Sequence, residues 1–234
     1  VEGHCHAMEG RVWDYPYVGF HDRRDPAGRL WKGLKSIDAV VERLQAEEAK
    51  MRDPSATMFA WGFDPIYFGG RRMVAADLDR VSSERPLMLV HASFHLLNVN
   101  SRILELSGID AGTNIEGVVK GPDGKPTGEL QELAARFIAH KVAGNPFQGK
   151  MPAASLDRFA SAACVAGVTT ATDLHSYLDE DTAATCREAA LRDDFPLRLL
   201  PAFATLAAPA AEGIAKVKAL MQQNLPKLRY GLVK

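Results

Sequence analysis

Strands alternate with helices through the last third of the chain, and this alternation constrains the fold more than any other feature. Apolar or β-branched runs at 168–170, 197–203 and 228–234 are typical of strands, and the segments between them have helical composition and length. Strands joined by helices of about 10–15 residues pair in parallel through right-handed crossovers. The sequence therefore predicts an α/β sheet or barrel whose last visible strand ends the chain.

The region between His6 and Ser155 follows a different rhythm, with short elements and frequent turn residues. Ser36 is placed to cap a helix, Gly108 to end one, and Pro122-Asp123-Gly124 to form a hairpin turn. In order, we expect an aromatic-rich loop over 7–29, helices after Ser36 and at 75–81, 100–106 and 128–141, strands at 58–63 and 87–91, and a hairpin at 118–125.

Two histidines stand two residues apart in the opening segment, which has the character of a strand. Side chains alternate along a strand, so His4 and His6 point the same way with Cα atoms roughly 6.5–7 Å apart, while Cys5 points away. Neutral imidazole is the commonest metal ligand and suits zinc, iron and nickel. The pair is competent to share one metal ion, although an isolated His-x-His also occurs without one.

Composition narrows the class of function. The chain has 28 Lys and Arg against 29 Asp and Glu, a net charge of −1, so we expect neither a nucleic acid nor a membrane as partner. A phosphate-binding glycine loop and a serine nucleophile elbow are both absent from the sequence. Three cysteines without paired spacing favour a reducing, cytoplasmic setting. We expect a small-molecule substrate; self-association into a homo-oligomer stays open.

Several stretches, taken in order, resemble one family. Gly3-His4-Cys5-His6 is similar to a first-strand His-x-His, and Gly167-Val168-Thr169-Thr170 to a later-strand GVTT motif. The other matching stretches are Trp61-Gly62-Phe63-Asp64, Asp77-Leu78-Asp79, Arg85-Pro86-Leu87, Phe94-His95 with Val99-Asn100-Ser101, Gly121 to Gly128 with Leu130 and Glu132, and Leu232-Val233-Lys234. Together they resemble the metal-dependent amidohydrolases, in particular the amidohydrolase family 3 branch that includes N-substituted formamide deformylase. Phe94 departs from the pattern, since a glycine is usual there.

The resemblance implies the first half of a (β/α)₈ barrel of the TIM type with a long α+β insertion after its first strand. Residues 1–6 would be barrel strand 1, residues 7–152 the loop and inserted subdomain, and residues 153–234 strands 2–4 with their helices. The first residue is not methionine and the last expected strand closes the chain. We therefore expect a segment of a larger protein, with the rest of the barrel and the remaining ligands outside it.

The resemblance also implies a metal centre of one or two divalent ions, most simply zinc. His4 and His6 would be ligands at the carboxyl end of the barrel. Lys234 would stand where many relatives carry a lysine that reacts with carbon dioxide to form a carbamate bridging two metals. The alternative for Lys234 is an ordinary solvated lysine, and branches without the bridge keep one metal.

Four further residues are candidates for substrate binding. The resemblance suggests that His95, on a turn after the strand 87–91, reaches the substrate, and it keeps Glu132 as a weaker candidate; a structural histidine and an exposed helical carboxylate are the alternatives. Asp173 and His175 follow the strand at 168–170, at the catalytic end of a barrel. Each of them is either a hydrogen-bond partner that orients a ligand imidazole or an ordinary polar residue of a loop. Glu129 is expected in the first turn of a helix, and His91 is expected to be structural.

The activity that the resemblance implies is hydrolysis of a carbon–nitrogen bond, most simply an amide, by a metal-activated water. The general base, an aspartate of the eighth strand, would lie outside this chain. The same machinery opens lactones and esters, so a lactonase or esterase is the first alternative. A catalytically silent barrel that binds a small molecule is the second.

Overall fold

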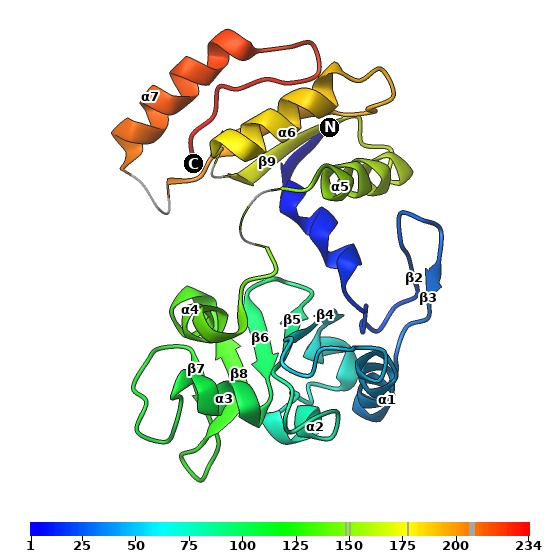
Figure 1. Ribbon diagram of the computed structural model, residues 1–234, viewed down its shortest axis with the longest axis vertical. Coiled ribbons are helices and arrows are strands. Elements are labelled where there is room, and N and C mark those ends of the chain that lie inside the picture. The colour runs from blue at the N-terminus through cyan, green and yellow to red at the C-terminus, as the bar shows by residue number, and fades with distance from the viewer. Residues whose placement is uncertain (148, 150, 177, 206–208) are drawn as a thin grey trace. The chain divides into compact units, whose positions relative to one another are not determined.

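In the computed structural model, which describes residues 1–147, 149, 151–176, 178–205 and 209–234, the chain forms two units (Figure 1). Unit 1 consists of Val1–Trp13, Asp25–Ala27 and Phe147–Lys234. Unit 2 consists of Asp14–Arg24 and Gly28–Pro146. The N-terminal segment therefore shares a unit with residues far along the chain.

Unit 1 is built on a parallel sheet of three strands in the order β1-β9-β10. The strands are β1 (Glu2–Cys5), β9 (Thr170–Ser176) and β10 (Arg198–Phe203). The helices of the unit are α5 (Ala153–Val165), α6 (Glu180–Leu191) and α7 (Ala210–Leu220), with short 3-10 helices η1 (Ala7–Asp14) and η4 (Met221–Gln223). This alternation is the parallel α/β arrangement that the sequence predicts, and it is compatible with part of a TIM-type fold.

The fourth predicted strand runs beside β10 and, in the residues that the structure describes, pairs with it through two isolated parallel bridges, Leu199 with Leu228 and Phe203 with Val233. The backbone N–H of Phe203 donates to the carbonyl of Leu232, and that of Lys234 donates to the carbonyl of Phe203. Leu225 also pairs with Leu228, in a tight turn at the start of this segment.

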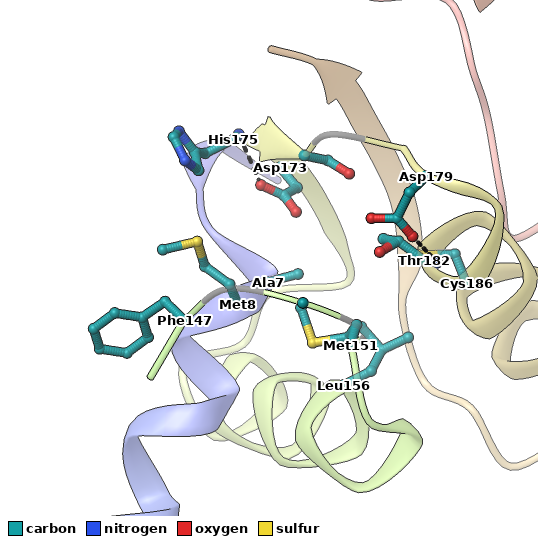
Figure 2. Close-up of a pocket in the computed structure, with 12 residues that line it drawn as sticks. Ala7, Met8, Phe147, Met151, Leu156, Asp173, His175, Asp179, Thr182 and Cys186 are labelled. Carbon is teal, nitrogen blue, oxygen red and sulfur yellow. Dashed lines mark hydrogen bonds between the residues drawn. The ribbon is translucent and has the colours of Figure 1, made fainter. Parts of the chain in front are cut away.

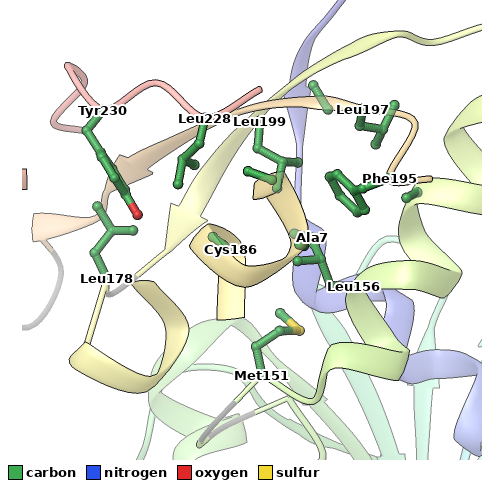
Figure 3. Packing of buried hydrophobic residues seen from close by; sticks show 14 of the residues in the cluster. Ala7, Met151, Leu156, Leu178, Cys186, Phe195, Leu197, Leu199, Leu228 and Tyr230 are labelled. Carbon is green, nitrogen blue, oxygen red and sulfur yellow. The ribbon is translucent and has the colours of Figure 1, made fainter. Parts of the chain in front are cut away.

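Apolar side chains from the sheet and the helices of unit 1 fill one core (Figure 3). Leu199 and Leu228 come from neighbouring strands, Leu156 from α5 and Phe195 from the turn before β10, and each is at most 2% exposed. Burying each such side chain contributes about 1.5–3 kcal/mol. The core therefore anchors the strand ends that carry the candidate site residues.

Unit 2 has a five-stranded sheet in the order β4-β5-β6-β8-β7, in which only β4 and β5 are parallel. Its strands are β4 (Met58–Phe63), β5 (Leu87–His91), β6 (Leu96–Val99), β7 (Val118–Lys120) and β8 (Pro126–Gln131), with a small hairpin of β2 (Arg23–Arg24) and β3 (Leu30–Trp31). Its helices are α1 (Ile37–Glu48), α2 (Ala75–Asp79), α3 (Ser101–Ser107) and α4 (Glu132–Ala143), with the 3-10 helix η2 (Pro65–Phe68).

Local signals predict several of these elements correctly. The Ser36 hydroxyl accepts a hydrogen bond from the N–H of Ala39 at the start of α1, and Gly108 ends α3 in the left-handed conformation. Both are the cap chemistry expected from the sequence. His91 is buried and bonds to Asn98, in keeping with a structural role.

Four expectations about local structure are wrong. The segment 128–131 is not helical but belongs to β8, because it pairs with β6, a strand that the sequence reading misses. Glu129 is consequently a buried strand residue. Residues 7–14 form η1 where a loop is expected. Finally, Asp173 and His175 lie within β9 itself, which extends to Ser176.

Among the described residues, no helix is both long and apolar enough to cross a membrane.

Candidate metal centre and adjoining cavity

His4 and His6 lie on the same side of the N-terminal segment, with ring centroids 5.2 Å apart. Between them, Cys5 turns toward the core of unit 1, and its thiol donates to the carbonyl oxygen of Thr172 at 3.1 Å. The strand alternation predicted from the sequence therefore holds for these three side chains. Burial is the main reason why the pKa of the Cys5 thiol rises to about 12, so this cysteine stays protonated at neutral pH.

Backbone irregularities occur in β1 and β9 beside these histidines. Glu2 pairs with Ala171 and Cys5 with Asp173, so three steps along β1 face two steps along β9. Further along, Asp173 pairs with Pro201 and Ser176 with Phe203, so β9 carries an extra residue over the stretch that contains His175. Such bulges re-aim side chains and are frequent next to functional sites.

His6 is brought next to β9 by the parallel pairing. Its Nδ1 atom lies 3.8 Å from Oδ1 of Asp173, and its ring centroid lies 5.7 Å from that of His175. The backbone N–H of His175 donates to the same Asp173 oxygen at 2.9 Å. The Nδ1 atom of His6 is buried, and no described group lies within hydrogen-bonding distance of it. The structure thus brings His4, His6, Asp173 and His175 together in one cluster.

A cavity of about 60 Å³ adjoins this cluster (Figure 2). Asp173 and His175 line it from β9, Asp179 and Thr182 from the beginning of α6. The other lining residues are Ala7, Met8, Phe147, Gly149, Met151, Leu156, Ser176 and Cys186, most of them apolar. The sequence reading does not single out Asp179 or the methionines. The cap position of Asp179 before a helix is the one local signal that could have identified it.

Lys234 lies at the carboxyl end of the same sheet, because its neighbour Val233 pairs with Phe203 at the end of β10. Its carbonyl oxygen accepts hydrogen bonds at 2.8 Å from both the N–H and the hydroxyl of Thr205. The residue is exposed. In the sheet order, β9 and β10 stand between Lys234 and the strand of His4, so the structure gives no contact between the two.

His4 and His6 fit part of a metal centre. They supply two imidazoles on one side, and Nδ1 of His6 is a buried polar atom with no hydrogen-bond partner among the described residues. Within the described part of the chain, no three His, Cys, Asp or Glu side chains are arranged to hold one ion. The two histidines would therefore contribute to a ligand set rather than complete one.

His95 and Glu132 contact each other in unit 2. Nδ1 of His95 lies 3.3 Å from Oε2 of Glu132, and the N–H of Glu132 donates to the carbonyl of His95 at 3.1 Å. Both side chains are exposed. Phe94 and Glu132 have positive φ angles, 60° and 56°, which non-glycine residues adopt at a cost of about 1–3 kcal/mol. The glycine usual in place of Phe94 would relieve that strain.

Glu129, which the sequence reading assigns to a helix, is instead the anchor of a buried ion pair. Its carboxylate is 1% exposed and accepts two hydrogen bonds from the guanidinium of Arg72, one of them 2.6 Å long, and a third from Gln131. Burial opposes ionisation of Glu129, but these bonds and the charge of Arg72 lower its pKa overall. This pair ties β8 to the segment before α2.

Comparison with known proteins shows the family of this chain. The sequence profile of the Amidohydrolase family matches residues 27–234. Protein LONG AFTER FAR-RED 3 from Arabidopsis thaliana is 28% identical over 155 residues, covering 64% of this chain and 26% of that protein. The chain thus spans about a quarter of that relative's length.

Two solved structures resemble the fold over 99% of this chain. Both are uncharacterized metal-dependent hydrolases, one from Pyrococcus furiosus (TM-score 0.53, 16% identity, 42% of that chain covered) and one from Pyrococcus horikoshii OT3 (0.52, 14%, 40%). At this identity the likeness concerns the fold, and the family match rests on the sequence profile. By that match over most of its length, the chain belongs to the Amidohydrolase family.

Proposed function

We propose that this chain forms part of a metal-dependent hydrolase that cleaves a carbon–nitrogen bond of the amide type in a small molecule. The observation that carries the proposal is the His4 and His6 pair at the end of a parallel strand, with the buried Nδ1 of His6 left without a hydrogen-bond partner in the part of the chain that the structure describes. Family membership and the fold likeness to metal-dependent hydrolases support it. The formamide deformylase-like branch is the proposed affiliation within the family.

His4 and His6 would hold a divalent ion, which we propose to be zinc. When bound, such an ion acidifies a water molecule and polarises a carbonyl group. The chain's own contribution is orientation: Asp173 lies 3.8 Å from Nδ1 of His6, and after a small movement of either side chain it would accept the Nδ1 proton and leave Nε2 to bind the ion. His175 belongs to the same cluster and lines the cavity, so we propose that it contacts substrate there.

We propose that Lys234 would help to hold a second ion, as the carbamate that its amine forms with carbon dioxide. In that reaction an N–C bond forms and the nitrogen loses a proton, so the amine must first be uncharged. The exposure of Lys234 and its place at the carboxyl edge of the sheet leave its amine accessible to carbon dioxide.

His95 and Glu132 are proposed to bind a polar atom of the substrate. Glu132 faces Nδ1 of His95, which favours a proton on that nitrogen and leaves Nε2 to accept a hydrogen bond, or to donate one when the ring is charged. The strained backbone on both sides of the pair supports a functional reading, since strain of this kind gathers at such sites.

Metal analysis tests the proposal most directly. The full-length protein should carry about one or two equivalents of a divalent metal, lost in a His4→Ala, His6→Ala double variant. His21→Ala, which changes an exposed histidine of unit 2, should retain the metal. Circular dichroism would verify that the variants are folded. A full-length protein that binds no metal under replete conditions would refute the mechanism and leave a barrel that binds small molecules without turnover.

The reaction itself would then be tested with paired substrates. N-acyl amines and the matching esters or lactones differ only in the atom that leaves, so the ratio of their kcat/KM values decides between an amidohydrolase and an esterase. We expect faster release of amine than of alcohol from matched pairs.

A further inference from the structure

The cavity beside His6 has an acidic wall. Asp173 and Asp179 both line it, and none of its described lining residues is a lysine or arginine. In Figure 2 the Asp173 carboxylate points toward the space between Met8 and Asp179. Arg11 donates a hydrogen bond to the carbonyl oxygen of Gly149, one of the lining residues.

The Asp173 carboxylate has little compensation for its burial. The residue is 6% exposed and, from the described residues, accepts one hydrogen bond, from the N–H of His175, while Nδ1 of His6 stays 3.8 Å away. A buried carboxylate with one neutral donor is unfavourable, and a positively charged partner offsets that cost. Burial, with the added charges of Asp173 and Asp179, raises the pKa of the nearby Cys186 thiol to about 12, so both carboxylates act on the same small region.

The opposite wall is apolar. Met8 on η1, Met151 just before α5 and Leu156 on α5 line the cavity (Figure 2). A volume of about 60 Å³ accommodates roughly four non-hydrogen atoms, at about 15 Å³ for each probe-sized group. Thioether and leucine side chains make this wall unsuited to a hydrated hard cation, which prefers oxygen ligands all around.

We propose that this cavity binds the ammonium group of a small primary amine, with Asp173 and Asp179 facing the charge and Met8 and Met151 packing against a short apolar stem. The link to catalysis rests on the proposed function. Hydrolysis of an amide adds OH to the acyl carbon and H to the nitrogen as the C–N bond breaks, and the released amine takes up a proton at neutral pH. The cavity, next to His6, would then hold the amine portion of the substrate and product.

Binding can be followed without catalysis. In full-length protein freed of metal by a chelator and labelled with ¹³C at the methionine methyl groups, propylammonium should shift the signals of Met8 and Met151 but leave that of exposed Met221 in place. Propanol and propionate, which match its size without its charge, should shift neither. Asp173→Asn should weaken propylammonium binding at least tenfold. Glu180→Gln is the matched control, because it also removes one negative charge, at the beginning of α6, but Glu180 does not line the cavity. This variant should bind propylammonium as the parent protein does.

The outcomes separate this site from the proposed function. Equal responses to propanol and propylammonium, or unchanged binding in Asp173→Asn, would overturn the amine site even in a protein that binds metal and hydrolyses amides. Amine binding in a protein that carries no metal would support the site and remove only its link to hydrolysis. If Asp173→Asn does not fold, Asp179→Asn keeps the helix cap and removes the second charge, and it should weaken binding likewise.

Discussion

The Nδ1 atom of His6 lies 3.8 Å from Oδ1 of Asp173, a residue 167 positions later in the chain. That distance is too long for a hydrogen bond, yet Nδ1 is buried and has no other described partner. A small movement of either side chain would close the gap. The imidazole would then be held with its proton on Nδ1 and its Nε2 atom ready to bind an ion.

We predict that Asp173→Asn weakens zinc binding by about 10–100-fold, the usual effect of removing a carboxylate that orients a ligand histidine. Asparagine keeps the size of the side chain and can accept the N–H of His175, but it lacks the charge that stabilises the ligating ring. Competition with a chromophoric chelator would measure the affinity. Glu180→Gln serves as the control, and equal affinities of Asp173→Asn and the parent protein would exclude this role.

The Arg72 and Glu129 pair is predicted to stabilise unit 2. Arg72→Met leaves a carboxylate that is 1% exposed with only Gln131 as a side-chain donor, and should lower the free energy of unfolding by about 2–3 kcal/mol. This expected loss is smaller than the full cost of breaking a buried pair, because the Arg72 side chain is 47% exposed and water can reach the site. Urea titrations, monitored by hydrogen exchange of the β6 and β8 amides, would measure the free energy of unfolding of unit 2.

A double variant provides the internal check. Adding Glu129→Gln to Arg72→Met removes the uncompensated charge and should restore at least about 1 kcal/mol. Arg80→Met, which breaks an exposed pair with Asp38, should change stability by no more than about 0.5 kcal/mol. If Arg72→Met and Arg80→Met lose equal stability, the buried pair contributes no more to stability than the exposed one, and the prediction is wrong.

Unit 1 shows why a sequence can predict a parallel sheet. Strands β9 and β10 are separated by a helix of the right length, and that spacing alone implies parallel neighbours. It also places His6, Asp173 and His175 on one edge, since parallel strands share their carboxyl ends. The bulges that set the directions of His4 and His175 depend on pairing between distant strands, and no local pattern reveals them.

Unit 2 shows where such reading fails. Strand β6 has four residues, too few for a clear alternation, and β8 contains Gly128 and Glu129, which favour turns and helices. What makes this segment a strand is its pairing with β6 and the bond between Glu129 and Arg72, partners separated by 57 residues. Tertiary contacts here override local preference, and the same contacts hold Glu132 beside His95.

Acid should destabilise unit 2 through His91. Burial lowers the pKa of this histidine despite its hydrogen bond to Asn98, so the folded state keeps the ring neutral while an unfolded chain protonates it near its ordinary value of 6.5. The contribution of neutral His91 to the free energy of unfolding is fully present above about pH 6.5. It is lost as the pH falls toward the lowered pKa of the folded state, by at most about 1.4 kcal/mol per pH unit. Glu129, with its pKa lowered below 4.5, stays ionised in this window.

The measurement is the free energy of unfolding of unit 2 at pH 7.5, 6.0 and 5.0, from hydrogen exchange in β5 and β6. His91→Gln should flatten the decline. Part of the decline should persist because burial also lowers the pKa of His140 on α4. His21→Gln, at an exposed position, should retain the full pH dependence. An unchanged slope in His91→Gln would show that the ring does not carry the effect.

Gly128 is predicted to be irreplaceable in β8. Its φ angle is +91°, and an added Cβ would lie 2.5 Å from the carbonyl oxygen of Val99 and 2.9 Å from Ala75. Backbone cannot yield there without breaking the pairing of β6 with β8, so Gly128→Ala should cost about 3 kcal/mol or more. Gly124→Ala, also at positive φ but in open space, should cost only about 1 kcal/mol. Thermal unfolding of the two variants compares them directly. Equal losses would mean that backbone conformation alone, and not the close approach of α2 and β6, requires glycine at position 128.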